Sequence, residues 1–137
     1  MQSIKRAAAV AGLAMLYLAP LNANANANNL CDVINGAVLV AQDNKGTFLG
    51  VIVNEFDSDS IFNEFGNHGS EFSAESIWNE FGSFGGEFSQ HSPFNEFTNE
   101  PPMIIKDRKI LGYLTVNEHI NGSLNPFILK GTCHSKL

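Results

Sequence analysis

Residues 60–97 read SIFNEFGNHGSEFSAESIWNEFGSFGGEFSQHSPFNEF, and this stretch contains nearly the same segment three times. Asn-Glu-Phe recurs at 63–65, 79–81 and 95–97, which gives a period of 16 residues. A second Glu-Phe pair has the same period, at 55–56, 71–72 and 87–88. Because repeated segments fold as similar units that pack on one another, this repeat is the strongest indication of the fold.

Each copy of the repeat opens on a serine, at Ser60, Ser76 and Ser92. Serine is a favoured first residue of a helix, and Pro93 follows the third serine, where the N–H that proline lacks has no helical partner. Gly66 and Gly82 come after the Phe, at a place suited to the left-handed conformation that ends a helix. We therefore predict one capped helical turn per copy, followed by an irregular, glycine-rich return.

Two segments outside the repeat have the pattern of β-hairpins. Residues 36–53 (GAVLVAQDNKGTFLGVIV) hold two β-branched-rich runs around the turn residues 43–46. Residues 103–116 (MIIKDRKILGYLTV) hold a second pair of runs around 107–109. We expect both hairpins to belong to one small sheet.

The two hairpins also resemble each other in sequence. LGVIVNE at 49–55 lies over LGYLTVNE at 111–118 with one residue inserted, so His119 stands where Phe56 stands. A hairpin followed by a repeat-like segment thus occurs twice, with the first segment expanded over 54–102. The second ends as a truncated repeat and tail over 117–137. We predict a mainly β fold with short helical turns, the alternative being an α+β fold.

The first 27 residues have the three parts of a secretory signal. Lys5 and Arg6 precede an apolar run over 7–21, and a small-x-small pattern follows at 23–27. A retained membrane anchor is the alternative, but Pro20 interrupts the run, which is shorter than the roughly 20 apolar residues of a span. We expect a secreted or periplasmic protein, with no membrane insertion after cleavage and a single domain over 28–137.

Cys31 and Cys133 are the two cysteines, one near each end of that domain. In an oxidising compartment an even number of cysteines predicts a disulfide, and closing so long a loop restricts the unfolded chain strongly. Free thiols and a metal pair are the alternatives, although the wide spacing is unlike that of metal sites. We therefore expect a Cys31–Cys133 disulfide joining the two ends.

Acidic residues dominate the expected domain, which holds six basic and fourteen acidic residues and a formal charge of −8. Binding to nucleic acid or to anionic lipid needs basic patches, so we expect neither. Between Lys45 and Lys106 there are ten carboxylates and no basic residue. Asp57 and Asp59 alternate as calcium ligands do, but they lack the Gly and distal Glu of an EF-hand. The alternative is a solvated acidic face without any cofactor.

Nine phenylalanines and one tryptophan lie between residues 56 and 97. The first interpretation is that these rings form the core, because each buried aromatic removes much surface from water. The second is that some of them form an exposed face that binds sugars or peptides. The candidates for that face are Trp78, Phe84, Phe62 and Phe94.

The sequence carries no motif of a known catalytic site. The histidines at 68, 91, 119 and 134 share no spacing, and no G-x-S-x-G, H-E-x-x-H or phosphate-binding loop is present. Paired carboxylates are plentiful, but catalysis needs a unique site rather than a repeated one. We expect no enzyme and no catalytic residue.

The repeat resembles a group of small secreted bacterial proteins built on S-x-x-N-P-[YF]-G-x-[YF]-G-S-x-[YF]-S. The resemblance covers residues 47–127 and rests on Asn63, Phe65, Gly66, Gly69, Ser70, Phe72, Ser73 and their partners 16 residues later. It implies export but brings no established activity. Pro follows Asn only at 125–126, Glu takes that place elsewhere, and the Lys and Arg of the related repeats are absent.

These observations favour an exported, non-enzymatic envelope or periplasmic protein with a binding or structural role. Its expected partner is a glycan or protein of the cell envelope. A calcium-stabilised extracellular module and a small cell-wall hydrolase are the alternatives.

Overall fold

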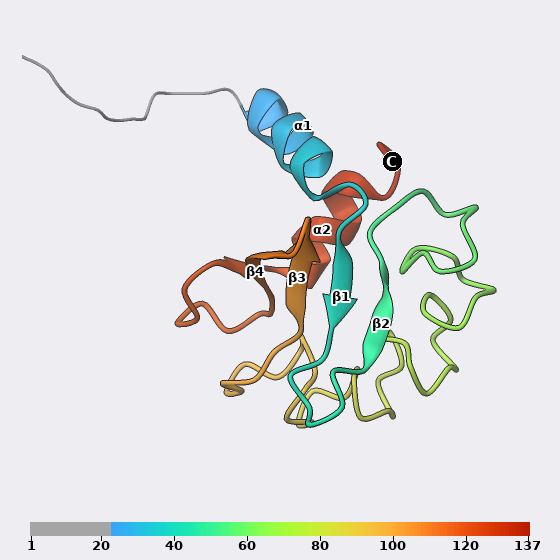
Figure 1. Cartoon of the computed structure of the whole chain (residues 1–137), viewed down its shortest axis with the longest axis vertical. Coiled ribbons are helices and arrows are strands. Elements are labelled where there is room, and N and C mark those ends of the chain that lie inside the picture. Colours follow the sequence, from blue (N-terminus) through green and yellow to red (C-terminus); the bar gives the residue numbers. More distant parts are fainter. Residues whose placement is uncertain (1–22) are drawn as a thin grey trace, which may run out of the picture.

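The computed structural model describes residues 23–137 (Figure 1). Most of the predicted signal therefore lies outside the described residues, and only 23–27 fall at the start of the first helix. The elements are α1 Ala23–Ile34, β1 Val38–Val40, β2 Phe48–Val51, β3 Met103–Lys106, β4 Lys109–Leu114, β5 Ser123–Leu124 and α2 Pro126–Cys133. Neither helix is long and apolar enough to cross a membrane.

The strands form one mixed sheet in the order β2-β1-β3-β4-β5. All neighbours pair antiparallel except β4 and β5, which are parallel. The predicted mainly β fold, with two hairpins in one sheet, is confirmed.

Both hairpin turns follow from their residues. In the first turn, the Asp43 carboxylate accepts hydrogen bonds from the hydroxyl and N–H of Thr47 and from Lys45 N, and these bonds lower the pKa of Asp43. In the second, Asp107 and Arg108 both have positive φ, as the two central residues of the favoured hairpin turn require.

The internal duplication appears in the hydrogen bonds. Val51 of β2 forms a parallel bridge with Ser60, and Tyr113 of β4 pairs in parallel with Ser123. Both glycines of the repeated Leu-Gly lie close to the segment that follows, because a Cβ would be 2.5 Å from the Gly122 oxygen at Gly112 and 3.0 Å from the Asp59 oxygen at Gly50. Of the two, only Gly50 has positive φ. Since β1 and β3 pair antiparallel at the centre, the two units are related by an approximate twofold axis.

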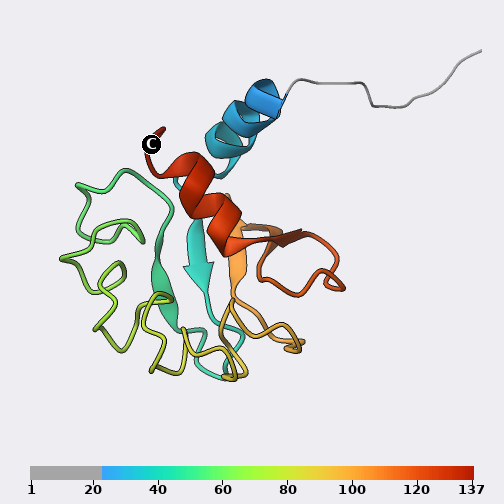
Figure 2. The same ribbon diagram turned by 180° about the vertical axis from the view of Figure 1, so that it is seen from behind.

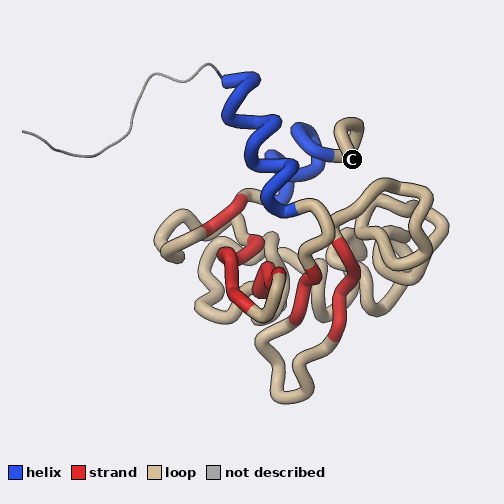
Figure 3. The backbone as a smooth tube through the Cα atoms, turned by 45° about the horizontal axis from the view of Figure 1, so that its top comes forward, coloured by secondary structure: helices blue, strands red, loops and turns tan. Residues whose placement is uncertain are grey.

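Between the two units, residues 54–98 form an unbroken chain of single turns, drawn without helix or strand in Figure 3. Most turns are closed by an N–H that bonds to the carbonyl three residues earlier, and the turn that starts at Gly66 is closed four residues on, by Ser70 N. The turns start at 54, 57, 60, 63 and 66, then at 70, 73, 76, 79 and 82, and then at 86, 89, 92 and 95. The same spacing reaches Thr98, where the series ends. Four steps of three residues and one of four give the period of 16. We call residues 54–98 the coil.

Small polar side chains hold these turns. The side-chain oxygen of a turn-opening residue accepts a hydrogen bond from the N–H two residues on. This happens at Asn54, Asp57, Ser60, Asn63, Ser70, Ser73, Ser76, Asn79, Ser92, Asn95 and Thr98. In each Asn-Glu-Phe, the Asn Nδ2 also donates to the carbonyl six residues earlier. Asp could not make this second bond, because its carboxylate has no donor, whereas the Asn amide supplies both an acceptor and a donor.

The prediction that Gly66 and Gly82 are left-handed is wrong. Among the described glycines, only Gly36, Gly46, Gly50 and Gly122 have positive φ. The glycine-rich return is also made of turns rather than being irregular. Glycine is needed there for close approach, because a Cβ at Gly69 would overlap the backbone of Asn63, and a Cβ at Gly85 would overlap that of Asn79.

The core lies between the sheet, the inner side of the coil and α2, which crosses the sheet in Figure 2. The coil contributes Ile61 and Ile77, which are fully buried with Leu39 and Leu49 of the sheet and Leu129 of α2. Burying an isoleucine contributes about 1.5–3 kcal/mol. The coil is thus anchored by its inner column of residues.

The disulfide Cys31–Cys133 links α1 to α2, as predicted. Both cysteines are buried in the core cluster, and the two helices lie together at one end of the molecule in Figure 3. The bond closes a loop across 102 residues, which encloses the sheet and the coil.

Replacing both cysteines by alanine should lower the free energy of unfolding by about 2–5 kcal/mol, because the unfolded chain loses its cross-link. Urea unfolding followed by circular dichroism measures the change. Wild-type protein with its disulfide reduced should match the variant, and a loss below about 1 kcal/mol would contradict the role given to the bond.

Gly69→Ala should cost about 1–3 kcal/mol or more, because a backbone carbonyl occupies the space of the new methyl group. Gly131→Ala is the matched control. It adds the same group inside α2, where nothing lies within 4 Å, and should stabilise the protein by up to about 1 kcal/mol. Equal effects of the two substitutions in urea unfolding would show that close approach does not explain Gly69.

Candidate binding groove

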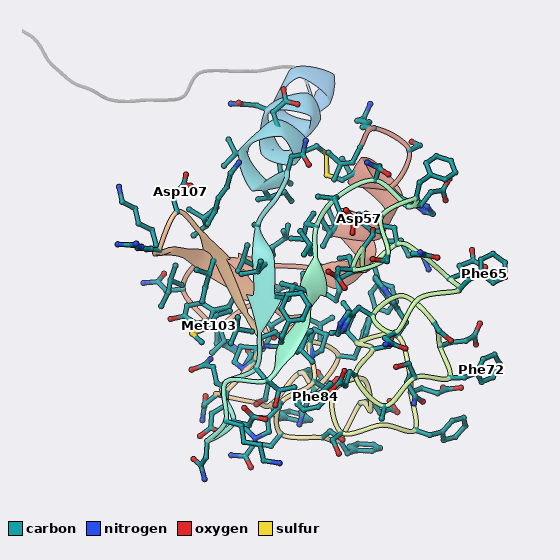
Figure 4. All side chains as sticks on the ribbon, turned by 45° about the vertical axis from the view of Figure 1, so that its right-hand side comes forward. Asp57, Phe65, Phe72, Phe84, Met103 and Asp107 are labelled. Carbon is teal, nitrogen blue, oxygen red and sulfur yellow. A yellow bond between two sulfur atoms is a disulfide. The ribbon has the colours of Figure 1, made fainter. Side chains whose placement is uncertain are left out.

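The phenylalanines of the six Glu-Phe pairs point away from the core. Their exposed fractions lie between 77% and 98%, at Phe56, Phe65, Phe72, Phe81, Phe88 and Phe97. In Figure 4, Phe65 and Phe72 project outward from the edge of the coil. Each of these rings sits two residues after the start of a turn, so its backbone N–H lies at a fixed point of the turn.

Because residues 16 apart occupy the same position in successive copies of the repeat, the exposed rings fall into two sets, which we call rows. One row is Phe56, Phe72 and Phe88, and the other is Phe65, Phe81 and Phe97. An exposed glutamate precedes every ring. Six exposed aromatic rings at regular positions are more than scattered apolar residues on a protein surface, and each of them stands beside a negative charge.

The aromatic residues predicted to form a binding face lie on the inner side of the coil. Phe62 is only 2% exposed and stacks on His134, so it contributes nothing to an accessible surface. Phe84 is half-buried and packs against the core. Trp78 and Phe94 are also half-buried, and their ring centroids are 5.8 Å apart.

Trp78 and Phe94 continue into a short aromatic ladder. The Phe94 ring lies 5.0 Å from that of Phe127, the first aromatic residue of α2. Trp78 Nε1 donates a 2.6 Å hydrogen bond to the Ile61 carbonyl, which fixes the indole. One edge of this ladder reaches solvent, since Phe127 is 65% exposed.

An open groove of about 1290 Å³ runs along this ladder. Aromatic rings and glutamates from both halves of the repeat line it. They are Phe72, Trp78, Phe81, Phe88, Phe94 and Phe127 together with Glu71, Glu80, Glu87 and Glu96. Among the described residues that line the groove, none is Lys, Arg or His. We call it the acidic aromatic groove.

One ring of this groove, that of Trp78, already contacts a cation from a residue outside the lining. Lys130 Nζ of α2 is 4.5 Å from the centre of the Trp78 ring. This is the geometry of a cation–π interaction, in which the negative face of an aromatic ring attracts a positive charge.

The two residues proposed as calcium ligands serve the backbone. Asp57 Oδ1 accepts a 2.8 Å hydrogen bond from Asp59 N, in the second turn of the coil. Within residues 23–137, no group of three or more His, Cys, Asp or Glu side chains could hold a metal ion. The calcium hypothesis therefore receives no support from the geometry.

Two histidines, His68 and His134, contact residues from other parts of the chain. His68 is buried, with Nδ1 3.2 Å from the Glu75 carbonyl and its ring at the edge of Phe48. His134 Nε2 lies 2.8 Å from Glu55 Oε1, which joins the C-terminal segment to the start of the coil. Both contacts join parts of the chain that are separate in sequence.

Comparisons with protein-family models, with curated proteins and with solved structures gave no match. The resemblance to small secreted bacterial repeat proteins therefore stays a prediction.

Lys130→Met should lower the free energy of unfolding by about 0.5–1 kcal/mol, because the cation–π contact with Trp78 is lost while the alkyl stem is kept. Trp78 is the single tryptophan, so its emission follows both the local change and urea unfolding. Lys136→Met is the control for charge removal near the same terminus. An equal loss in both variants would contradict a specific contact.

Proposed function

We propose that this chain is an exported, non-catalytic interaction protein that uses its coil as the binding surface. One observation carries the proposal: six phenylalanines are exposed at regular positions while other apolar residues fill the core. Burying one such ring against a partner would contribute about 1.5–3 kcal/mol. Aromatic residues are also enriched in protein interfaces.

The sheet, the disulfide and α2 support this role by making a rigid base. The turns of the coil are held by side-chain hydrogen bonds, and the inner column is buried in the core. The rings therefore belong to a preorganised surface, which reduces the entropy that binding has to offset.

The non-catalytic reading rests on the placement of the acidic residues. The glutamates of the Glu-Phe pairs are exposed and repeated, and within the described residues Glu55 alone among them has a side-chain partner, His134 of the C-terminal segment. A hydrolase would need one carboxylate set apart from the rest by its surroundings.

The proposed location is the periplasm or the cell exterior, with an envelope protein or glycan as partner. The disulfide is consistent with an oxidising compartment outside the cytoplasm. The predicted signal segment and the resemblance to secreted repeat proteins support the same location.

Cross-linking of the purified protein to cell-envelope fractions tests the proposal. Wild type should recover a defined partner. Two triple variants each replace one row by serine, either Phe56, Phe72 and Phe88 or Phe65, Phe81 and Phe97. Each variant should reduce recovery about tenfold or more, since at least one ring buried by the partner would be lost. Because the rings are exposed, thermal stability should stay within a few degrees.

Ile110→Ser/Leu111→Ser is the matched control, because it removes exposed apolar side chains from β4 instead of the coil. Recovery that is unchanged by both row variants, or reduced equally by the control, would contradict the proposed surface.

A further inference from the structure

We propose that the acidic aromatic groove binds a basic polypeptide, namely a Lys- or Arg-rich segment of a partner protein. This inference rests on the proposed function, which it extends by naming the class of partner. The segment would lie along the groove with its alkyl stems against the rings and its cationic groups beside the glutamates.

Charge complementarity carries the first part of the argument. Glu71, Glu80, Glu87 and Glu96 line the groove. Across the whole stretch between Lys45 and Lys106 there is no basic residue to neutralise them. A concave surface of one charge attracts the opposite charge and repels its own, so a basic segment is favoured over an acidic polymer.

The aromatic rings point to the same chemistry. Lys130, which does not itself line the groove, shows that the Trp78 ring accepts a cation, because its Nζ lies over that ring. Lys and Arg side chains bind aromatic faces, and Arg also stacks through its planar guanidinium group. At the rims, Glu80 precedes Phe81 and Glu87 precedes Phe88, so one cationic side chain could contact a ring and its neighbouring carboxylate.

The size of the groove suits an extended chain rather than a small molecule. Its volume of about 1290 Å³ exceeds the roughly 300–1,000 Å³ of a typical small-molecule site. The lining residues come from successive copies of the repeat and from α2, so the groove runs across several elements.

A second copy of this chain is a less favourable partner. Its own basic cluster, Lys106, Arg108 and Lys109, lies at the β3–β4 turn, and in Figure 4 the labelled Asp107 of that turn is on the far side from Phe65 and Phe72. Lys106 Nζ is already bonded to the Val33 carbonyl. The net negative charge of the chain also opposes self-association.

Titration with octa-arginine, octa-lysine and octa-glutamate peptides tests the proposal. Trp78 emission reports on the groove, and isothermal titration calorimetry gives a second readout. We expect saturable binding of both basic peptides, tighter for octa-arginine, and none of octa-glutamate. Raising the salt from about 0.05 to about 0.5 M should weaken binding about tenfold or more.

Glu80→Gln/Glu87→Gln should weaken octa-arginine binding about fivefold or more, because it removes two carboxylates from the groove. Glu64→Gln/Glu118→Gln makes the same charge change at exposed positions that do not line the groove, and should have less than about half that effect. Lys130→Met should strengthen binding, since it frees the Trp78 ring and removes a competing cation.

Several outcomes would overturn the inference. They are no binding of either basic peptide by calorimetry, equal weakening by the two glutamine pairs, or binding of octa-glutamate. Self-association that Arg108→Glu/Lys109→Glu abolishes would instead make a second copy the occupant. If the peptides fail but a partner is still recovered through the rows of phenylalanine, only this inference falls; if both fail, the proposed function falls with it.

Discussion

The hydrogen bond that a backbone N–H donates to the short polar side chain two residues earlier is the interaction on which this structure depends. It recurs at most of the turns along the coil, and it fixes a path that is neither helix nor strand. Ordinary secondary structure satisfies the backbone through its own repeating bonds. Here the side chains share that task, which leaves the residues between them free to be either buried or displayed.

Besides sharing the core, the sheet and the coil are joined by hydrogen bonds at both ends of the coil. The parallel bridge between Val51 and Ser60 attaches the start of the coil to β2. At the other end, Val116 N donates to the Pro93 carbonyl and Asn117 Nδ2 donates to the Thr98 carbonyl. The second unit of the duplication thus closes the coil that the first unit begins, which gives a physical reason for both units to be present.

The hairpins, their duplication and the disulfide could be predicted because their signals are local or countable. The turn residues at 43–46 indicate a hairpin, the repeated Leu-Gly indicates the duplication, and the two cysteines indicate the disulfide. The inner and outer sides of the repeat could not be predicted in the same way, since Phe occurs on both. A useful signal was present: each outward Phe follows a Glu, whereas the inward Phe62 and Phe94 follow Ile or Pro. The prediction for Gly66 and Gly82 failed because both continue the chain of turns instead of ending a helix.

The step of sixteen residues has a consequence for how such a chain can vary. One copy of the repeat returns the backbone to an equivalent position. Ser60, Ser76 and Ser92 show this, because each accepts a hydrogen bond from the N–H two residues later. Insertion or deletion of a whole unit would therefore keep the turns in phase while it lengthens or shortens the surface by one copy of the repeat. The number of exposed Phe rings, and with it the number of contacts that a partner could make, could change by duplication of the repeat without a change in the sheet.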